Sequence, residues 1–199
     1  MENIGVLGGT FNPVHNGHVR LVELFLESVG NSRVIVIPAN APHYKPMRDF
    51  APPVDRLNMC RTAFKGMKNV QVSDMEICAD GFCYTADTLT KIKEANPDAA
   101  LYLIMGSDAL KGMLKWYRAA DIIALATIFS VARDKDIPDA LRQNIKRIEQ
   151  MGGQAVISGC QPLAVSSTEV RRRIREGASV EGLLPDDVTE YVLQRGLYK

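Results

Sequence analysis

The sequence predicts an α/β fold in which helices cover both faces of a parallel sheet. Short apolar runs alternate with segments of helical periodicity along almost the whole chain. The apolar runs are often rich in β-branched residues, which is typical of strands covered on both faces. The chain has 199 residues, of which 46% are hydrophobic and 24% charged. A globular chain of this length buries a core that is large enough to need no disulfide or metal.

The predicted strands and helices follow one another in a regular order. The expected strands are residues 4–7, 33–38, 70–77 (irregular), 101–105, 126–132 and 155–158. The expected helices are residues 19–29, 54–67, 85–95, 107–113, 118–121, 138–151, 166–176 and 185–195. Residues 39–53 contain four prolines and little periodicity, so we expect a long loop there.

This order predicts a Rossmann-like, doubly wound parallel sheet, because crossovers between parallel strands are right-handed. No repeat, low-complexity tract or linker interrupts the chain, so we expect one domain over residues 1–199, with a helical C-terminal part at 166–199. Ligands bind such sheets at the carboxyl ends of the strands. The most informative residues follow predicted strands, at 8–18, 39–45, 106–108, 133 and 166–171.

Charge and composition exclude several classes of protein. The formal net charge of +1 argues against a protein that coats nucleic acid or a membrane surface. No apolar run approaches the length of a membrane span, and the N-terminus lacks signal-peptide character, so we expect a cytoplasmic protein. The four cysteines form no C-x-x-C pair and no zinc spacing with the histidines. We expect each of them to be reduced, buried and inert.

The segment GGTFNPVHNGH, residues 8–18, joins the first predicted strand to the first predicted helix. Gly8 and Gly9 have no Cβ, so a phosphate group could approach the backbone there. His15 and His18 are three residues apart and face the same way on a first helical turn. Two imidazoles beside a helix N-terminus favour binding of an anionic phosphate. The alternative is a glycine-rich turn with two surface histidines.

A second informative segment, VSSTEVRRRI at residues 165–174, starts a late helix. Ser166 and Glu169 have the spacing of a capping box, which fixes the helix start. Hydroxyl groups and free backbone N–H groups at that start would suit a phosphate, and Arg171 lies one turn further on as a planar donor. The alternative is an ordinary capped helix with a solvated basic face.

Together, GGTFNPVHNGH and VSSTEVR resemble the paired signatures of the nucleotidylyltransferase superfamily. Further segments resemble one family within it, the nicotinate-mononucleotide (nicotinate-nucleotide) adenylyltransferases of NAD biosynthesis. They are PHYK at 42–45, YTADTL at 84–89, GSDAL at 106–110 with Trp116, and LPDDVTEYVLQRGLY at 184–198. The resemblance spans nearly the whole chain and implies a single nucleotidylyltransferase domain.

The resemblance implies transfer of AMP from ATP to nicotinate mononucleotide, which gives deamido-NAD (nicotinate adenine dinucleotide) and pyrophosphate, with Mg²⁺. The nucleophile would be the phosphate of the mononucleotide, which is largely dianionic at neutral pH because its second pKa is about 6. The reaction then needs positioning and charge neutralisation rather than a general base. The expected catalytic residues are His15, His18 and Arg171.

The same resemblance implies two sets of binding residues. The expected ATP-binding residues are Gly8, Gly9, Thr10, Phe11, His15, His18, Gly106, Asp108, Arg133, Ser167, Thr168 and Arg171. The expected mononucleotide-binding residues are Gly9, Thr10, Phe11, His43, Lys45, Tyr84, Thr85 and Trp116. Thr85 opens a helix whose N-terminus suits the nicotinate carboxylate, and Trp116 could stack on the pyridine ring.

Simpler interpretations stand beside several of these roles. They are a solvated surface lysine for Lys45, a core or interface residue for Trp116, a helix cap for Asp108 and a surface arginine for Arg133. Position 12 is Asn where Asp is common in the superfamily, so we assign Asn12 no metal role. No carboxylate cluster suggests a protein-built magnesium site, and the expected Mg²⁺ is carried by the phosphates of ATP and by water.

The sequence leaves rival functions open. A sister transferase would act on nicotinamide mononucleotide or phosphopantetheine, and a non-catalytic sensor would bind the nucleotide alone. A fragment of an aminoacyl-tRNA synthetase is a third rival, since H-N-G-H resembles the H-I-G-H of that superfamily, but the chain has no room for an anticodon-binding domain. The expected partners are ATP and nicotinate mononucleotide, without nucleic acid or membrane. A homo-oligomer and closure of the 39–53 loop over substrate both remain open.

Overall fold

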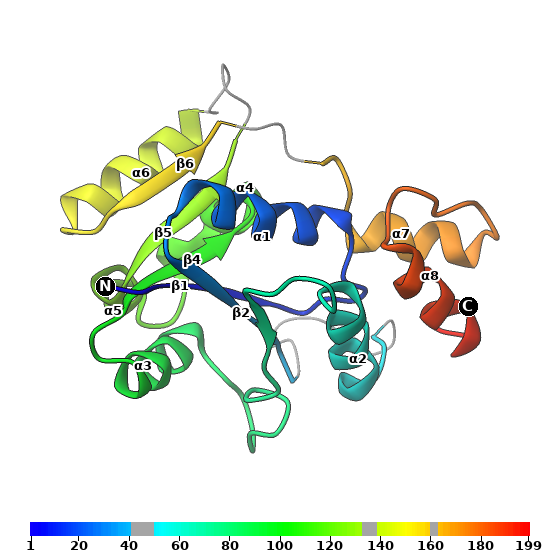
Figure 1. The fold of residues 1–199 in the computed structure, drawn as a ribbon. Coiled ribbons are helices and arrows are strands. Elements are labelled where there is room, and N and C mark those ends of the chain that lie inside the picture. The colour runs from blue at the N-terminus through cyan, green and yellow to red at the C-terminus, as the bar shows by residue number, and fades with distance from the viewer. Residues whose placement is uncertain (41–49, 133–138, 160–162) are drawn as a thin grey trace.

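A sheet of six parallel strands forms the centre of the protein (Figure 1). The structure is a computed structural model that describes residues 1–40, 50–132, 139–159 and 163–199. The strands are β1 (Asn3–Gly9), β2 (Ser32–Pro38), β3 (Val70–Val72), β4 (Ala100–Met105), β5 (Ala126–Val131) and β6 (Ala155–Ser158). They lie in the order β3-β2-β1-β4-β5-β6, and each pairing is parallel. The predicted parallel sheet is therefore confirmed.

Helices connect these strands and cover both faces of the sheet, as predicted. They are α1 (Asn16–Ser28), α2 (Pro53–Ala63), α3 (Thr85–Ala95), α4 (Ser107–Gly112), the 3-10 helix η2 (Met113–Lys115), α5 (Ala119–Leu125), α6 (Asp139–Gln150), α7 (Ser167–Arg175) and α8 (Asp186–Gln194). In Figure 1, α6 lies with β6 at one end of the molecule, and α7 and α8 lie at the other end near α2.

Alternation along β2 shows how one strand serves two hydrophobic cores. Val34 and Val36 belong to a cluster formed with residues of α1, α2, α7 and α8. Ile35 and Ile37 belong to a second cluster, formed with residues of α3, α4, α5 and α6. Because successive side chains of a strand point to opposite faces, a continuous apolar run fills both cores. This arrangement confirms the doubly wound architecture.

Gly5 allows α1 to pack closely against the middle of the sheet. A Cβ atom at this position would lie 2.6 Å from Phe25 Cε1 and 2.7 Å from Ile104 Cδ1, which is closer than real contacts allow. The ring of Phe25 also meets the ring of Phe129 edge to face, with centroids 5.2 Å apart. The close approach fixes α1 across β1, β4 and β5 and sets the N-terminus of α1 at the carboxyl end of β1.

Some predicted boundaries are wrong. The expected strand at 70–77 ends at Val72, after the backbone N–H of Ser73 donates to Val36 O at 2.9 Å. The chain then turns, with Cys78 N–H donating to Asp74 O at 2.9 Å, because β3 is an edge strand with β2 as its one partner. Other elements shift by a few residues; α1 begins at Asn16 rather than at residue 19.

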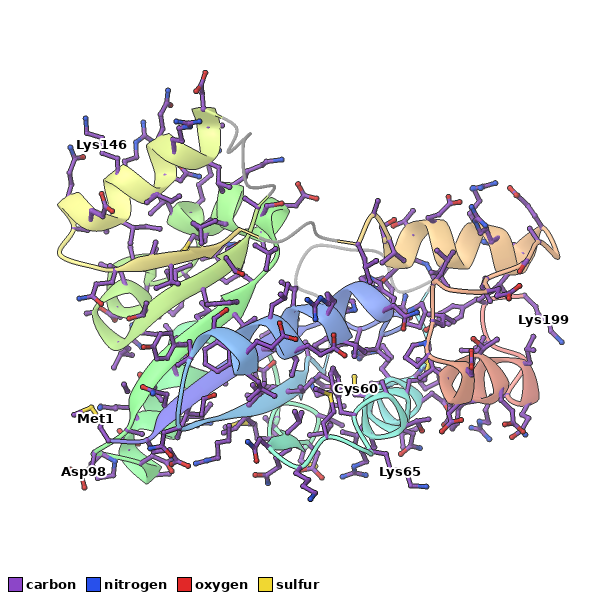
Figure 2. The ribbon with its side chains drawn as sticks, turned by 45° about the horizontal axis from the view of Figure 1, so that its top comes forward. Met1, Cys60, Lys65, Asp98, Lys146 and Lys199 are labelled. Carbon is purple, nitrogen blue, oxygen red and sulfur yellow. The ribbon has the colours of Figure 1, made fainter. Side chains whose placement is uncertain are left out.

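The cysteines correct a second expectation. Cys60 lies on the inner side of α2 and is buried, which raises the pKa of its thiol (Figure 2). Cys78, however, is exposed and Cys83 half-buried, so the expected burial is wrong for both residues. Cys160 lies outside the described residues. None of the helices in the described ranges combines the length and apolar character that spanning a membrane requires.

Candidate nucleotide-binding site

A cleft of about 730 Å³ opens at the carboxyl ends of β1 and β4. The strand order reverses between these two strands, which is where open α/β sheets bind their ligands. Many of the predicted site residues line it: Gly8, Gly9, Thr10, His15, His18, Tyr84, Thr85, Gly106, Asp108 and Trp116. We call Gly8, Gly9, Thr10, His15 and His18 the histidine end of the cleft, and Tyr84, Thr85, Trp116 and Tyr117 its aromatic end.

Four of the predicted residues within the described ranges do not line this cleft. Phe11, Ser167, Thr168 and Arg171 lie behind or beside the histidine end rather than in its wall. Phe11 is buried, and the centroid of its ring lies 4.9 Å from that of His18, edge to face. His43, Lys45 and Arg133 lie outside the described residues, so their predicted roles stay predictions.

The two histidines at the start of α1 form a stacked pair. His15 is the N-cap residue of the helix and His18 lies in the first turn. The ring centroids are 3.6 Å apart with an interplanar angle of 22°. The backbone N–H of His15 donates to Nδ1 of His18 at 3.1 Å. A neutral imidazole that accepts at Nδ1 carries its proton at Nε2, so this hydrogen bond assigns His18 an Nε2–H donor.

Burial keeps both imidazoles neutral at pH 7. It lowers the pKa of His15 from 6.5 to about 4. The pKa of His18 is lowered by its burial and by the neighbouring charge of His15 when that ring is protonated. The histidine end therefore offers neutral N–H donors at a helix N-terminus rather than two fixed cations. Nδ1 of His15 is itself buried and has no hydrogen-bond partner among the described residues.

Glycines at the histidine end serve different purposes. An added Cβ at Gly8 would meet no atom within 4 Å, so the backbone there borders open space in the cleft. A Cβ at Gly17 would lie 2.9 Å from Val165 Cγ1 and 3.1 Å from Nδ1 of His15. Gly17 thus lets the start of α1 approach the segment that leads into α7. The first signature is packed against the second at this point.

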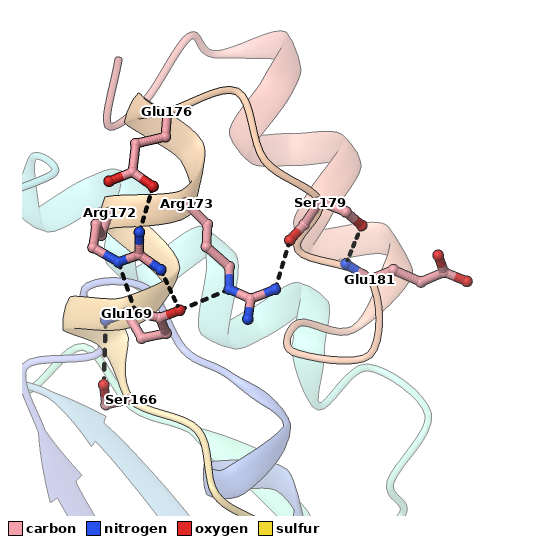
Figure 3. Close-up of polar contacts among 7 residues, drawn as sticks. All are labelled: Ser166, Glu169, Arg172, Arg173, Glu176, Ser179 and Glu181. Carbon is pink, nitrogen blue, oxygen red and sulfur yellow. Dashed lines mark hydrogen bonds and ion pairs between the residues drawn. The ribbon is translucent and has the colours of Figure 1, made fainter.

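Two arginines of helix α7, Arg172 and Arg173, pair with the carboxylates of Glu169 and Glu176 (Figure 3). Arg171 of the same helix is instead directed at residues 8–18. Ser166 accepts a hydrogen bond from the backbone N–H of Glu169 at 3.2 Å, which confirms the predicted cap. The carboxylate of Glu169 pairs with Arg172 and Arg173, both at 2.8 Å, and these hydrogen bonds lower its pKa to about 2. Arg172 also pairs with Glu176.

The second signature contacts the first directly. Nη1 of Arg171 donates to the backbone oxygen of Asn12 at 2.8 Å. The hydroxyl of Ser167 donates to the backbone oxygen of Pro13 at 2.9 Å. Nε of Arg171 is buried and has no hydrogen-bond partner in the described part of the chain. The structure thus brings together two segments that lie more than 150 residues apart in the sequence.

Arg56 is a site-supporting residue that the sequence did not reveal. It is 1% exposed, and its guanidinium group donates to four backbone carbonyl oxygens. They belong to Thr10 (2.7 Å), Ala39 (2.6 Å), Asn40 (2.6 Å) and Ala51 (3.2 Å). Burial lowers the pKa of this group. Arg56 therefore ties the loop after β1 to the end of β2, and nothing in the helical pattern of α2 distinguishes it.

The aromatic end lies at the start of α3, and its tyrosines are more exposed to solvent than His15 is at the histidine end. Tyr84 is the N-cap residue of α3 and is 38% exposed. Its ring centroid lies 4.4 Å from that of Tyr117, a residue for which the sequence predicted no role. Trp116 is partly buried against the hydrophobic core and also lines the cleft, so it serves as both a core and a cleft residue. The side chain of Tyr84 makes no hydrogen bond that caps the first turn of α3.

The side chains of Asp108 and Asn12 both interact with other groups of the protein. Asp108 is not the cap of α4, because Gly106 holds that position; its carboxylate pairs with Lys111 at 2.9 Å. The side-chain oxygen of Asn12 accepts hydrogen bonds within the protein, from Ala51 N–H and the Tyr198 hydroxyl, both at 2.9 Å. The described residues contain no group of three or more His, Cys, Asp or Glu that would hold a metal.

Comparison with known proteins places the chain in a family. Residues 6–173 match the cytidylyltransferase-like family, and the chain belongs to it. Two full-length relatives are each described as a probable nicotinate-nucleotide adenylyltransferase. The protein from Dehalococcoides mccartyi is 37% identical over 198 residues, which cover 98% of this chain and 96% of the relative. The protein from Lachnoclostridium phytofermentans is 33% identical over 199 residues, which cover 100% of this chain and 100% of the relative.

The fold also recurs among solved structures. The nicotinic acid mononucleotide adenylyltransferase of Plasmodium falciparum, complexed with NaAD, superposes with a TM-score of 0.81. The match covers 100% of this chain and 98% of that one at 17% sequence identity. This likeness supports the Rossmann-like architecture of the sheet and its helices.

Proposed function

We propose that the protein is a nicotinate-nucleotide adenylyltransferase of NAD biosynthesis. It transfers AMP from ATP to nicotinate mononucleotide and yields deamido-NAD and pyrophosphate. The observation that carries this proposal is the contact of the two signatures beside one cleft, from Arg171 Nη1 to Asn12 O. Relatives of the same length that are described with this activity support the choice among nucleotidyltransferases.

The chemistry is a displacement at the α-phosphorus of ATP. An oxygen of the mononucleotide phosphate forms a bond to that phosphorus, and the bond from the phosphorus to the bridging α–β oxygen breaks. The electron pair of the broken bond leaves with pyrophosphate. The attacking phosphate is already largely dianionic, so the enzyme contributes positioning and stabilisation of charge on the phosphoryl oxygens.

The histidine end binds the phosphates in this proposal. Nε2–H of His18 and an N–H of His15 donate to oxygens around the α-phosphate, and Gly8 lets a phosphate approach the backbone. Arg171 and the start of α7, with Ser167 and Thr168, neutralise the remaining phosphates of ATP. Arg171 lies beside the histidine end, where Nη1 donates to the backbone oxygen of Asn12, and its permanent positive charge supports this role.

The aromatic end binds the mononucleotide base. The side chain of Tyr84 does not cap the first turn of α3, so the N–H groups at this helix start suit the nicotinate carboxylate. Trp116 stacks on the pyridine ring from the edge of the core. This arrangement favours the acid over the amide, because the amide has no negative charge to interact with the helix N-terminus.

Magnesium enters this reaction as part of the substrate, MgATP. The described residues offer no carboxylate or histidine cluster for a resident ion, and the Asn12 side chain is engaged inside the protein. We therefore assign the ion to the phosphates and to water, as is common for Mg²⁺ at phosphate sites. Its contribution there is to neutralise charge on the polyphosphate.

The test is release of pyrophosphate from MgATP with each acceptor in turn: nicotinate mononucleotide, nicotinamide mononucleotide and phosphopantetheine. We expect kcat/KM for the acid to exceed that for the amide by up to about thirtyfold, since one charged contact at a helix N-terminus is worth up to about 2 kcal/mol. Preference for the amide or for phosphopantetheine would replace the substrate assignment. ATP binding without turnover of any acceptor would indicate a sensor.

A further inference from the structure

The C-terminal end of the chain reaches back to the loop between β1 and α1. After α8 the chain turns at Gly196, which has a φ of +61°, and Tyr198 follows with a φ of +67°. The side chain of Tyr198 packs against the core cluster of α1, α2, α7 and α8. Its hydroxyl donates to Oδ1 of Asn12 at 2.9 Å, across 186 residues of sequence. The penultimate residue therefore contacts the first signature.

Asn12 is a junction that several parts of the protein share. It is 2% exposed, and its Oδ1 also accepts from the backbone N–H of Ala51 at 2.9 Å. Its backbone oxygen accepts from Arg171. It follows Phe11, whose φ of +48° is unusual for a residue with a side chain. A backbone in such a conformation persists only where the surroundings hold it, and the Tyr198 hydroxyl is one of the groups that do so.

The electrostatic surroundings suit Tyr198 as a permanent donor. Burial raises the pKa of its phenol, and the nearby guanidinium groups of Arg171 and Arg56 offset part of that rise. The phenol keeps its proton at neutral pH and donates to Asn12, which a phenolate cannot do. The same two arginines donate to backbone oxygens of the loop, at Asn12 O and Thr10 O. Tyr198 thus lies near both of the guanidinium groups that fix this loop.

We propose that Tyr198 is a positioning residue for adenylyl transfer, which holds Asn12 so that the loop at residues 10–15 and Arg171 keep their mutual geometry. This inference rests on the proposed function for its kinetic test. Tyr198 acts through Asn12, because Tyr198 itself does not line the cleft. The effect should fall on kcat, because phosphoryl transfer depends on donors that are placed before the reaction begins.

Tyr198→Phe removes the hydroxyl and keeps the ring. We expect kcat to fall about three- to tenfold, the range that corresponds to one ordinary hydrogen bond, with KM for both substrates changed less than about twofold. Tyr191→Phe is the matched control. It removes a second C-terminal hydroxyl, which donates to Asp55 of α2 at 2.7 Å and does not touch the loop. We expect its kcat to stay within about twofold of the wild type.

A double-mutant cycle tests the route through Asn12. If Tyr198 acts on catalysis through this residue, Tyr198→Phe has no further effect on kcat in an Asn12→Ala background. A full additional loss there would overturn the proposal. So would an equal fall of kcat in Tyr191→Phe, or a lower melting temperature of Tyr198→Phe with unchanged kcat, because each of these results indicates a merely structural hydroxyl.

Amide hydrogen exchange of the protein without substrates gives a readout that does not depend on its activity. We expect Tyr198→Phe to speed exchange in the segment at residues 10–16 and at the Ala51 N–H, and Tyr191→Phe to leave both unchanged. Unchanged exchange in Tyr198→Phe would refute the positioning role even if the proposed reaction is correct. Faster exchange in a protein that turns over no mononucleotide would support the loop contact and refute only the proposed function.

Discussion

The two ends of the cleft are built in different ways. At the histidine end the buried ring of His15 stacks on the ring of His18, which is half-buried, and the loop before them is fixed by Arg56, Arg171 and Tyr198. At the aromatic end Tyr84 and Tyr117 are exposed, and their ring centroids lie 4.4 Å apart. The first end is held by hydrogen bonds that span the whole sequence, and the second by a helix start and aromatic rings.

In the proposed function, this difference assigns the rate to the histidine end and the selection of the mononucleotide to the aromatic end. Charge changes during the reaction at the phosphates, and donors there act best when they are rigid and shielded from water. The base of the mononucleotide does not react, so its binding needs contact area and one helix N-terminus. Variants at the histidine end should therefore change kcat, and variants at the aromatic end should change KM.

Replacement of His18 should have the largest effect. His18→Ala removes an Nε2–H donor from the α-phosphate, and we expect kcat to fall on the order of 10²–10³-fold, as for other preorganised donors. The Kd for ATP should change much less, because the donor acts mainly in the transition state. Steady-state kinetics and equilibrium ATP binding measure the two quantities. Equal losses in both would favour a nucleotide sensor.

A pair of amide variants sharpens this result. The amide of Gln reaches the position of Nε2, and that of Asn reaches the position of Nδ1. Because the hydrogen bond from His15 N–H assigns the donor to Nε2, His18→Gln should retain more activity than His18→Asn. The reverse order would show that the other tautomer of His18 is active.

The buried imidazoles should also make stability depend on pH. The pKa of His15 is about 4 in the folded protein and near 6.5 in the unfolded chain, so the unfolded state binds more protons between these values. Stability is then fully present above pH 6.5 and falls as the pH drops toward 4, by up to about 3 kcal/mol from this residue. Urea unfolding of wild type and His15→Gln at pH 7 and 4.5 measures the difference, which should shrink in the variant.

The smallest effect is expected at the aromatic end. Trp116→Ala should raise KM for nicotinate mononucleotide about tenfold, since stacking on an aromatic ring is worth roughly 1–3 kcal/mol, with kcat within about threefold. Trp116→Phe keeps a ring and should recover most of the affinity. Since Trp116 also packs on the core, melting temperatures of both variants must accompany the kinetics. A fall in kcat with unchanged KM would contradict the assignment of KM effects to the aromatic end and kcat effects to the histidine end.

Strongly periodic segments made the central strands predictable, whereas the point at which an edge strand ends was not predictable from its sequence. Within the expected strand at 33–38, residues 34–37 are apolar on both sides of the pleat, and they form the part of β2 that fills two cores. The expected strand at 70–77 failed after Val72, because an edge strand pairs on one side and the chain is free to turn. The exposure of Cys78 has the same origin, since sequence patterns do not reveal which turns another element covers.

The sequence by itself determined the alternating fold, the turn that carries His15 and His18, and the capped helix that carries Arg171. These features depend on neighbours within one or two helical turns, so residue spacing is enough to specify them. Only the tertiary structure decided that the histidines are neutral, that Arg56 binds four carbonyl oxygens and that Tyr198 reaches Asn12. Burial and contacts between distant segments arise when the whole chain packs, and no local pattern encodes them.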